Sequence, residues 1–162
     1  MLRNLTWVAV LALGFTAARG AEAQSAGSPA PVKYPGLSAR IEAPDTVRLS
    51  DGLTLRLLVR NDTDSQIMLP VTWEGDFAFD PIARDAQGRV VWHRLFGQYL
   101  SAVGVSRIIK PHETTTYRAT WNLRNSYGVP LPAGSYRVTG RLIDGRDSIL
   151  VSAAEVQVVI TR

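Results

Sequence analysis

Residues 53–60 read LTLRLLVR, with leucine or valine at every second position from Leu53 to Val59. The residues between them are polar except Leu58, so an extended chain would have one apolar and one polar face. A helix would instead need apolar residues every three or four positions. This segment therefore predicts a β-strand that packs one face against a core.

The same alternation recurs in short runs that end at turn residues. It is found near residues 66–71, 79–84, 89–93, 117–121, 136–142 and 156–160. The connections, such as Asn61–Asp64 and Asp85–Gly88, are too short for crossover helices. We therefore expect an all-β fold, an immunoglobulin-like antiparallel β-sandwich of about seven to nine strands, with a closed barrel as the main alternative.

The amino end has the three-part pattern of an export signal. Arg3 precedes an apolar stretch, Leu5–Phe15, and the small residues Ala21-Glu22-Ala23 suit a cleavage site. The apolar stretch is shorter than the roughly 20 residues that span a bilayer. We therefore predict a signal peptide over residues 1–23 and a periplasmic or secreted protein, with no stable membrane insertion after cleavage.

The remaining chain divides into a linker and one domain. Residues 24–36 are rich in Pro, Ser and Ala, which predicts a flexible tether. Residues 37–162 then form the predicted sandwich, which has no cysteine and so no disulfide to stabilise it. The net charge of +4 is mild and no basic run occurs, so a nucleic acid is not expected as a partner.

Three stretches resemble the BsuPI family of intracellular proteinase inhibitors. They are residues 57–63, residues 79–92 with their Asp85-Ala86-Gln87-Gly88 turn and Val91-Trp92, and residues 117–121 followed by 128–138. The resemblance covers most of the domain and implies an immunoglobulin-like fold and inhibition of a proteinase. It carries over no reactive-site residue. The predicted export signal differs from the intracellular role of that family.

The chemistry-bearing residues do not form a pattern typical of catalysis. The two histidines, His93 and His112, have no partner at metal-ligand spacing, and we expect both imidazoles to be solvated. The serines lack a nucleophile-elbow motif, and turn chemistry accounts for the acidic pairs Asp62/Asp64 and Asp76/Asp80. We therefore expect no enzyme, no cofactor and no metal site.

Two segments mix aromatic, basic and flexible residues, as binding surfaces do. Residues 92–104 contribute Arg94, Phe96 and Tyr99, and residues 122–130 contribute Arg124, Tyr127 and Pro130. If both segments lie at the same end of the sandwich, they form one contact surface. The alternative is that Phe96, Leu100 and Val103 fold back to cap the core.

The sequence therefore favours a binding module over an enzyme. The leading hypothesis is a protein partner, specifically a proteinase inhibited by a rigid surface loop. Two alternatives stay open. The first is a glycan that stacks on Trp73, Tyr99 or Tyr127, and the second is a protein partner that pairs with an exposed sheet edge.

Overall fold

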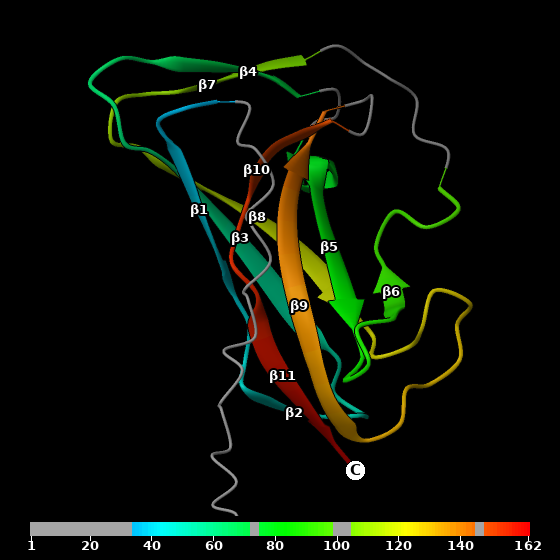
Figure 1. The fold of residues 1–162 in the computed structure, drawn as a ribbon. Helices are drawn as coiled ribbons and strands as arrows, with labels where there is room; N and C mark the ends of the chain where they lie inside the picture. The colour runs from blue at the N-terminus through cyan, green and yellow to red at the C-terminus, as the bar shows by residue number, and fades with distance from the viewer. Residues whose placement is uncertain (1–33, 72–74, 99–104, 145–147) are drawn as a thin grey trace, which may run out of the picture.

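The structure is a computed structural model that describes residues 34–71, 75–98, 105–144 and 148–162 (Figure 1). These residues form eleven strands and a single turn of 3₁₀ helix, η1 (Gly75–Ala78). Within them, no helix has the length and apolar character needed to cross a membrane. The predicted signal peptide and most of the predicted tether lie outside the described residues.

Most strands belong to two sheets. The first sheet contains β1 (Leu37–Glu42), β3 (Leu53–Asn61) and β8 (Thr114–Trp121). The second runs in the order β2 (Thr46–Arg48), β11 (Val156–Thr161), β9 (Gly134–Ile143), β5 (Phe79–Arg84) and β6 (Val90–His93). In addition, β10 (Ile149–Ser152) pairs with the end of β9. The fold is thus an all-β sandwich, as the alternation predicts, and not a closed barrel.

The order of the strands is that of an immunoglobulin domain. There, the first, second and fifth strands share one sheet, and the third, sixth and seventh share the other. Here β1, β3 and β8 take the first set of places, and β5, β9 and β11 take the second. All pairs are antiparallel except β2 with β11, where the chain leaves β1 and joins the second sheet in parallel.

The strand number exceeds the predicted seven to nine because of short pieces that carry little alternation. β2 and β10 are three and four residues long and lie at the edge of the second sheet. A two-stranded arm, β4 (Ile67–Val71) and β7 (Val105–Ile109), also extends beyond β3 and β8 (Figure 1). The junction of the arm is held by the buried side chain of Asn61.

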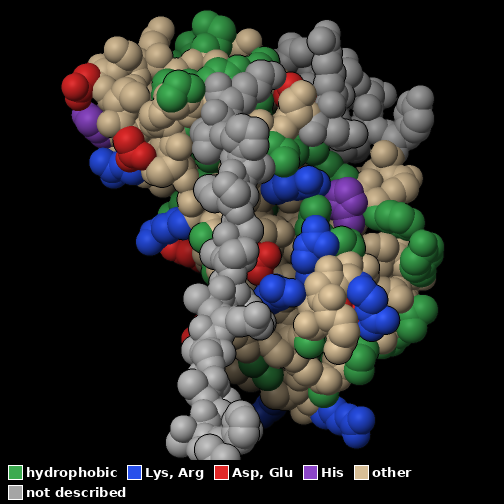
Figure 2. Space-filling view, viewed as in Figure 1, with side chains coloured by type: hydrophobic (Ala, Val, Ile, Leu, Met, Phe, Trp, Pro, Cys, Tyr) green, Lys and Arg blue, Asp and Glu red, His purple; other side chains and the backbone are tan. Residues whose placement is uncertain are grey.

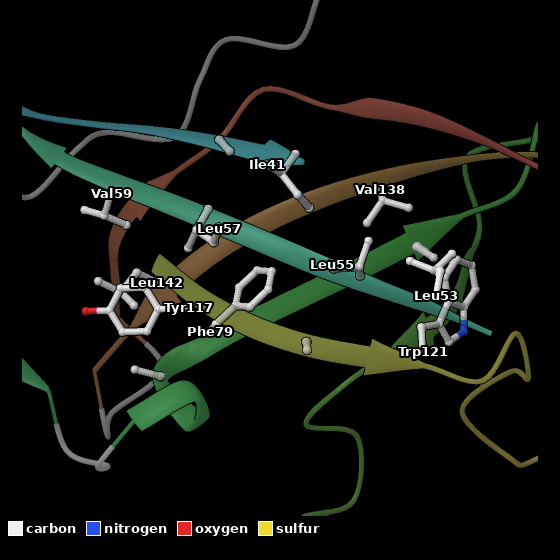
Figure 3. Packing of buried hydrophobic residues seen from close by; sticks show 14 of the residues in the cluster. Ile41, Leu53, Leu55, Leu57, Val59, Phe79, Tyr117, Trp121, Val138 and Leu142 are labelled. Atoms are coloured by element: carbon white, nitrogen blue, oxygen red, sulfur yellow. The ribbon is translucent and has the colours of Figure 1, made fainter. Parts of the chain in front are cut away.

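The core lies between the two sheets, as the alternation in β3 predicts. Leu55, Leu57 and Val59 are fully buried, and they face side chains of the second sheet such as Phe79 and Val138 (Figure 3). Arg56 and Arg60 are exposed at outward positions of the same strand. This packing fixes which strand faces are available for binding.

Tyr136, near the start of β9, has its ring in the core and its hydroxyl on the backbone. The hydroxyl donates a hydrogen bond to the carbonyl of Pro132 at 2.8 Å. Such a tyrosine corner is a hallmark of immunoglobulin-like sandwiches. It anchors the connection between β8 and β9, and that connection carries Arg124, Tyr127 and Pro130.

We expect Tyr136→Phe to lower the free energy of unfolding by about 1 kcal/mol, because the substitution removes one hydrogen bond and leaves the Pro132 carbonyl unpaired. Urea denaturation followed by tryptophan fluorescence measures the change. The control is Tyr127→Phe, which alters a ring that is 79% exposed and should shift stability by less than about 0.5 kcal/mol. Equal stability of the two variants would contradict the assigned anchoring role.

Candidate functional site

The structure brings the two candidate binding segments together. The rings of Phe96 and Tyr127 meet edge to face with their centroids 5.1 Å apart. Beside them, the amide of Ser126 donates to the carbonyl of Val91 at 3.0 Å, and the amide of His93 donates to the Ser126 hydroxyl at 3.1 Å. The connection between β8 and β9 therefore docks against the free edge of β6.

The contact leaves apolar side chains exposed to water. Phe96, Tyr127 and Val129 are 47%, 79% and 56% exposed, and we call these three residues the aromatic ridge. Figure 2 shows hydrophobic side chains gathered on this side of the molecule, where Figure 1 places the loops that follow β6 and precede β9. Phe96 therefore does not fold into the core, as the capping alternative required. Leu100 and Val103 lie outside the described residues.

The part of the ridge that carries Tyr127 is a tight, internally bonded turn. The side-chain oxygen of Asn125 accepts hydrogen bonds from the amides of Tyr127 and Val129, both at 2.9 Å. The backbone amide of Asn125 donates to the Val129 carbonyl at 2.8 Å. Gly128 takes the positive φ of 84° that the turn requires. The guanidinium of Arg124 then donates to the Gly128 carbonyl at 2.7 Å. These bonds hold Tyr127 in one backbone conformation.

A second turn of the same kind lies between β5 and β6. There Asp85 accepts from the amides of Gln87 and Arg89, and Gly88 has a φ of 80°. Both turns follow the pattern Asx-x-x-Gly, in which the Asx side chain caps the turn and glycine takes the left-handed position. The pattern at Asp85–Gly88 predicts a turn, whereas residues 122–130 stood out only by their mixture of aromatic, basic and flexible residues. The pattern at Asn125–Gly128 would have identified them as a hairpin.

Arg94 has a structural role that the sequence did not suggest. Its guanidinium donates to the carbonyl of Phe79 at 2.8 Å and to that of Asp76, so it fastens η1 to the sheet. It also lies 5.6 Å from the centroid of the Phe77 ring. Burial lowers the pKa of Arg94, and the nearby carboxylates of Asp76 and Asp80 oppose this shift. Arg94 is therefore committed to internal contacts rather than held free for a ligand.

The remaining predicted site residues are Arg124, Pro130 and Tyr99. Arg124 and Pro130 pair across the hairpin in an isolated bridge, and with Ser50 and Arg162 they line a shallow hollow. Arg124 thus braces the turn through the Gly128 carbonyl. Tyr99 and Trp73 lie outside the described residues.

A buried carboxylate lies on the outward face of the second sheet. Asp80 in β5 is fully buried, with the Nε2 of His93 2.8 Å from its carboxylate and the guanidinium of Arg141 donating to it. The expectations of a solvated His93 and of turn chemistry for Asp80 are therefore wrong. Periodicity assigns a strand face to each residue, but it does not reveal the neighbour across the sheet.

His112 and the remaining acidic residues lie nearer the surface. His112 contacts Asp64 at 2.9 Å, and both side chains are more than half exposed. Asp76 accepts a hydrogen bond from the backbone amide of Arg118 at 2.6 Å, which occupies part of the free edge of β8. In the parts of the chain that the structure describes, no three histidine or acidic side chains lie close enough to hold a metal ion.

No family model matches the chain, and no curated protein matches it. Among solved structures it is similar to a CARDB domain from Pyrococcus furiosus in complex with di-metal ions, at 12% identity and a TM-score of 0.42, over 83% of this chain and 95% of that one. A mutant β-glucosidase from Listeria innocua in complex with laminaribiose matches at 13% identity and a TM-score of 0.43, over 78% of this chain and 16% of that one.

A Pseudomonas fluorescens alkylpurine DNA glycosylase bound to DNA matches at 12% identity and a TM-score of 0.41, over 85% of this chain and 32% of that one. The chain therefore spans only a minor part of either enzyme. Any functional conclusion has to come from the residues of this chain.

Proposed function

We propose that this domain is a non-catalytic, exported protein-binding module, periplasmic or secreted, and that the aromatic ridge is its contact surface. The observation that carries the proposal is Tyr127, which is 79% exposed at the tip of a turn braced by Asn125. Exposed aromatic side chains on rigid supports dominate many binding interfaces, because little conformational entropy is lost when they bind. Phe96 and Val129 add apolar area next to this anchor.

A proteinase is the partner class that we propose first. The resemblance of residues 79–92 and 128–138 to the BsuPI family supports it, and so does the bracing of the Asn125–Val129 turn. An inhibitor loop benefits from such bracing because it does not have to be ordered by the enzyme.

A glycan is the second candidate ligand. The Tyr127 ring is exposed enough to offer a flat stacking surface, and this favours the glycan-binding alternative. A partner strand that pairs with a sheet edge has less support. Ser126 covers the edge of β6, and on the edge of β8 the backbone amide of Arg118 already donates to the Asp76 carboxylate. We therefore place the ridge ahead of the sheet edges as the contact surface.

Titration of the purified protein against subtilisin-like, trypsin-like and metallo-proteinases tests the proposal. We expect one class to be slowed, and Tyr127→Ser to weaken that inhibition by about tenfold or more, as loss of an aromatic anchor does. Met68→Ser is the matched control, because Met68 is 57% exposed on the distant β4–β7 arm and should have no effect.

Two results would count against the proteinase version. One is that no proteinase is slowed, and the other is that Met68→Ser weakens inhibition as much as Tyr127→Ser does. In the first case, retention on peptidoglycan that is lost in Tyr127→Ser would establish the glycan-binding alternative instead.

A further inference from the structure

Three arginines project from the outward face of the second sheet, beside the aromatic ridge. Arg137 and Arg141 lie in β9, and Arg84 in β5 pairs directly with Arg137 across the ladder. Their strand neighbours Ala83, Val138 and Leu142 face the core, so the arginines point away from it. We call Arg84, Arg137 and Arg141 the arginine row. Figure 2 shows Lys and Arg side chains gathered over β5 and β9.

Arg84 and Arg137 carry like charges at directly opposed positions. The guanidinium of Arg84 donates to the Gly88 carbonyl at 3.1 Å, and a guanidinium nitrogen of Arg137 lies 3.5 Å from the place of a Cβ on Gly88. Both cationic groups thus reach the same turn residue. Opposed like charges destabilise a sheet, and an anion bound between them would relieve the repulsion.

The structure supplies little negative charge to this pair. Arg137 has Glu155 at 3.7 Å, with both side chains more than 40% exposed, and in the described residues Arg84 has no carboxylate partner. The third member of the row is held in place, because the buried carboxylate of Asp80 accepts from Arg141. The row is therefore a cationic surface in which Arg141 is fixed by Asp80, Arg137 is weakly paired with Glu155, and Arg84 has no carboxylate partner among the described residues.

An arginine pair on the opposite sheet provides a comparison. Arg56 and Arg118 are also directly opposed, in β3 and β8. Glu42 lies 3.5 Å from Arg56, much as Glu155 lies 3.7 Å from Arg137, so each pair has one nearby carboxylate. The arginine row differs in that the guanidinium groups of Arg84 and Arg137 both reach the same turn residue, Gly88.

We propose that the arginine row binds an extended acidic segment of the protein partner; this rests on the proposed function, because the same partner contacts the aromatic ridge. Outward residues along β9 are spaced about 7 Å apart at every second position, and alternate side chains of an extended peptide have the same spacing. Arg137 and Arg141 are four positions apart, with Thr139 between them, so carboxylates four positions apart in such a peptide, about 13 Å, would meet both arginines in register.

The neighbouring surface explains the choice of a peptide over an anionic polymer. Only β6 separates Arg84 from the ridge, because β5 pairs with β6 and β6 is covered by Ser126. A polymer with charge but no apolar groups would leave Phe96 and Tyr127 exposed. A peptide with acidic residues followed by an apolar side chain satisfies both surfaces.

Fluorescence anisotropy with a labelled peptide tests the inference. The peptide carries glutamate at alternate positions and a terminal leucine, and its control carries glutamine in place of glutamate. We expect only the acidic peptide to bind, and its affinity to fall at high salt. The double variant Arg84→Gln/Arg137→Gln should lower its affinity by about tenfold or more. The matched control, Arg56→Gln/Arg118→Gln, removes the same charge from the other sheet and should change affinity less than about twofold.

Several outcomes would overturn the inference. They are equal loss of affinity in both double variants, equal binding of the glutamine peptide, and tighter binding of polyphosphate than of the acidic peptide. Tyr127→Ser separates this proposal from the proposed function. If peptide binding needs the arginine row but not Tyr127, the row is a binding surface and the role proposed for the ridge is rejected. If binding needs Tyr127 but not the arginine row, only the role proposed for the row is rejected.

Discussion

Trp121→Ala is expected to lower the free energy of unfolding by about 3–5 kcal/mol, the loss typical of a large aromatic side chain removed from a core. Trp121 is fully buried at the end of β8. It stacks on Trp92 with the ring centroids 5.0 Å apart and meets Tyr136 edge to face at 6.2 Å. A cavity at this place would therefore remove contacts with both β6 and β9.

The same substitution should also loosen the turn that presents Tyr127. The indole nitrogen of Trp121 donates to the carbonyl of Arg124 at 2.9 Å, and Arg124 in turn braces Gly128. Trp121 thus connects the core to the proposed contact surface. Loss of binding in this variant is expected in addition to the loss of stability.

Urea denaturation followed by circular dichroism measures the effect, because the substitution removes a tryptophan from the fluorescence signal. Trp121→Phe is the control, since it keeps most of the apolar contact but loses the hydrogen bond to Arg124. We expect its stability to lie between those of the wild type and Trp121→Ala. A loss below about 1 kcal/mol for Trp121→Ala would show that the site collapses around the cavity.

Asn61→Asp is expected to destabilise the protein by about 3 kcal/mol or more at neutral pH. The side-chain amide of Asn61 is fully buried and donates to the carbonyls of Ser65, Ile109 and Lys110 at 2.7, 3.1 and 3.1 Å. A carboxylate of the same shape would place a buried negative charge against three carbonyl oxygens. The arm formed by β4 and β7 would lose its junction with β3 and β8.

The effect of Asn61→Asp should depend on pH in a defined direction. Burial and the three carbonyls favour the protonated acid, so the pKa of the new carboxyl would be higher in the folded than in the unfolded protein. Folded protein then binds more protons, and stability falls as the pH rises above the ordinary aspartate pKa of about 3.9. We expect the variant to approach the wild type in stability as the pH is lowered towards 4.

Asn61→Ala separates the loss of the donor from the introduced charge. It leaves the three carbonyls without their amide donor, and we expect a loss of about 1–3 kcal/mol that does not change with pH between 4 and 7. If Asn61→Asp shows the same loss and no pH dependence, the side chain at position 61 is not enclosed as the structure describes.

The main features of the fold could be predicted from local patterns. The alternation in residues 53–59 identified β3 and its buried face, and the Asp85–Gly88 turn identified the hairpin between β5 and β6. Four strands were missed. β2 and β10 have three or four residues, which carry too little alternation to distinguish a strand from a loop, and β1 and β7 were not among the predicted segments.

The candidate site could be predicted only in part. Phe96 and Tyr127 were selected because aromatic residues in loops favour binding, and the structure makes them neighbours. Arg94 was selected for the same reason, yet it is held by the carbonyls of Phe79 and Asp76. Composition does not distinguish an arginine that awaits a ligand from one that is bonded within the fold.

By itself, the sequence determined most of the longer strands, their buried faces and several of the turns between them, because these follow from residues a few positions apart. Tertiary structure alone decided which distant residues meet. Asp80 and Arg141, 61 positions apart, become partners only through the register of β5 on β9. Likewise, the aromatic ridge exists only because the hairpin after β8 docks on β6. Such contacts depend on how whole strands align, which no local pattern encodes.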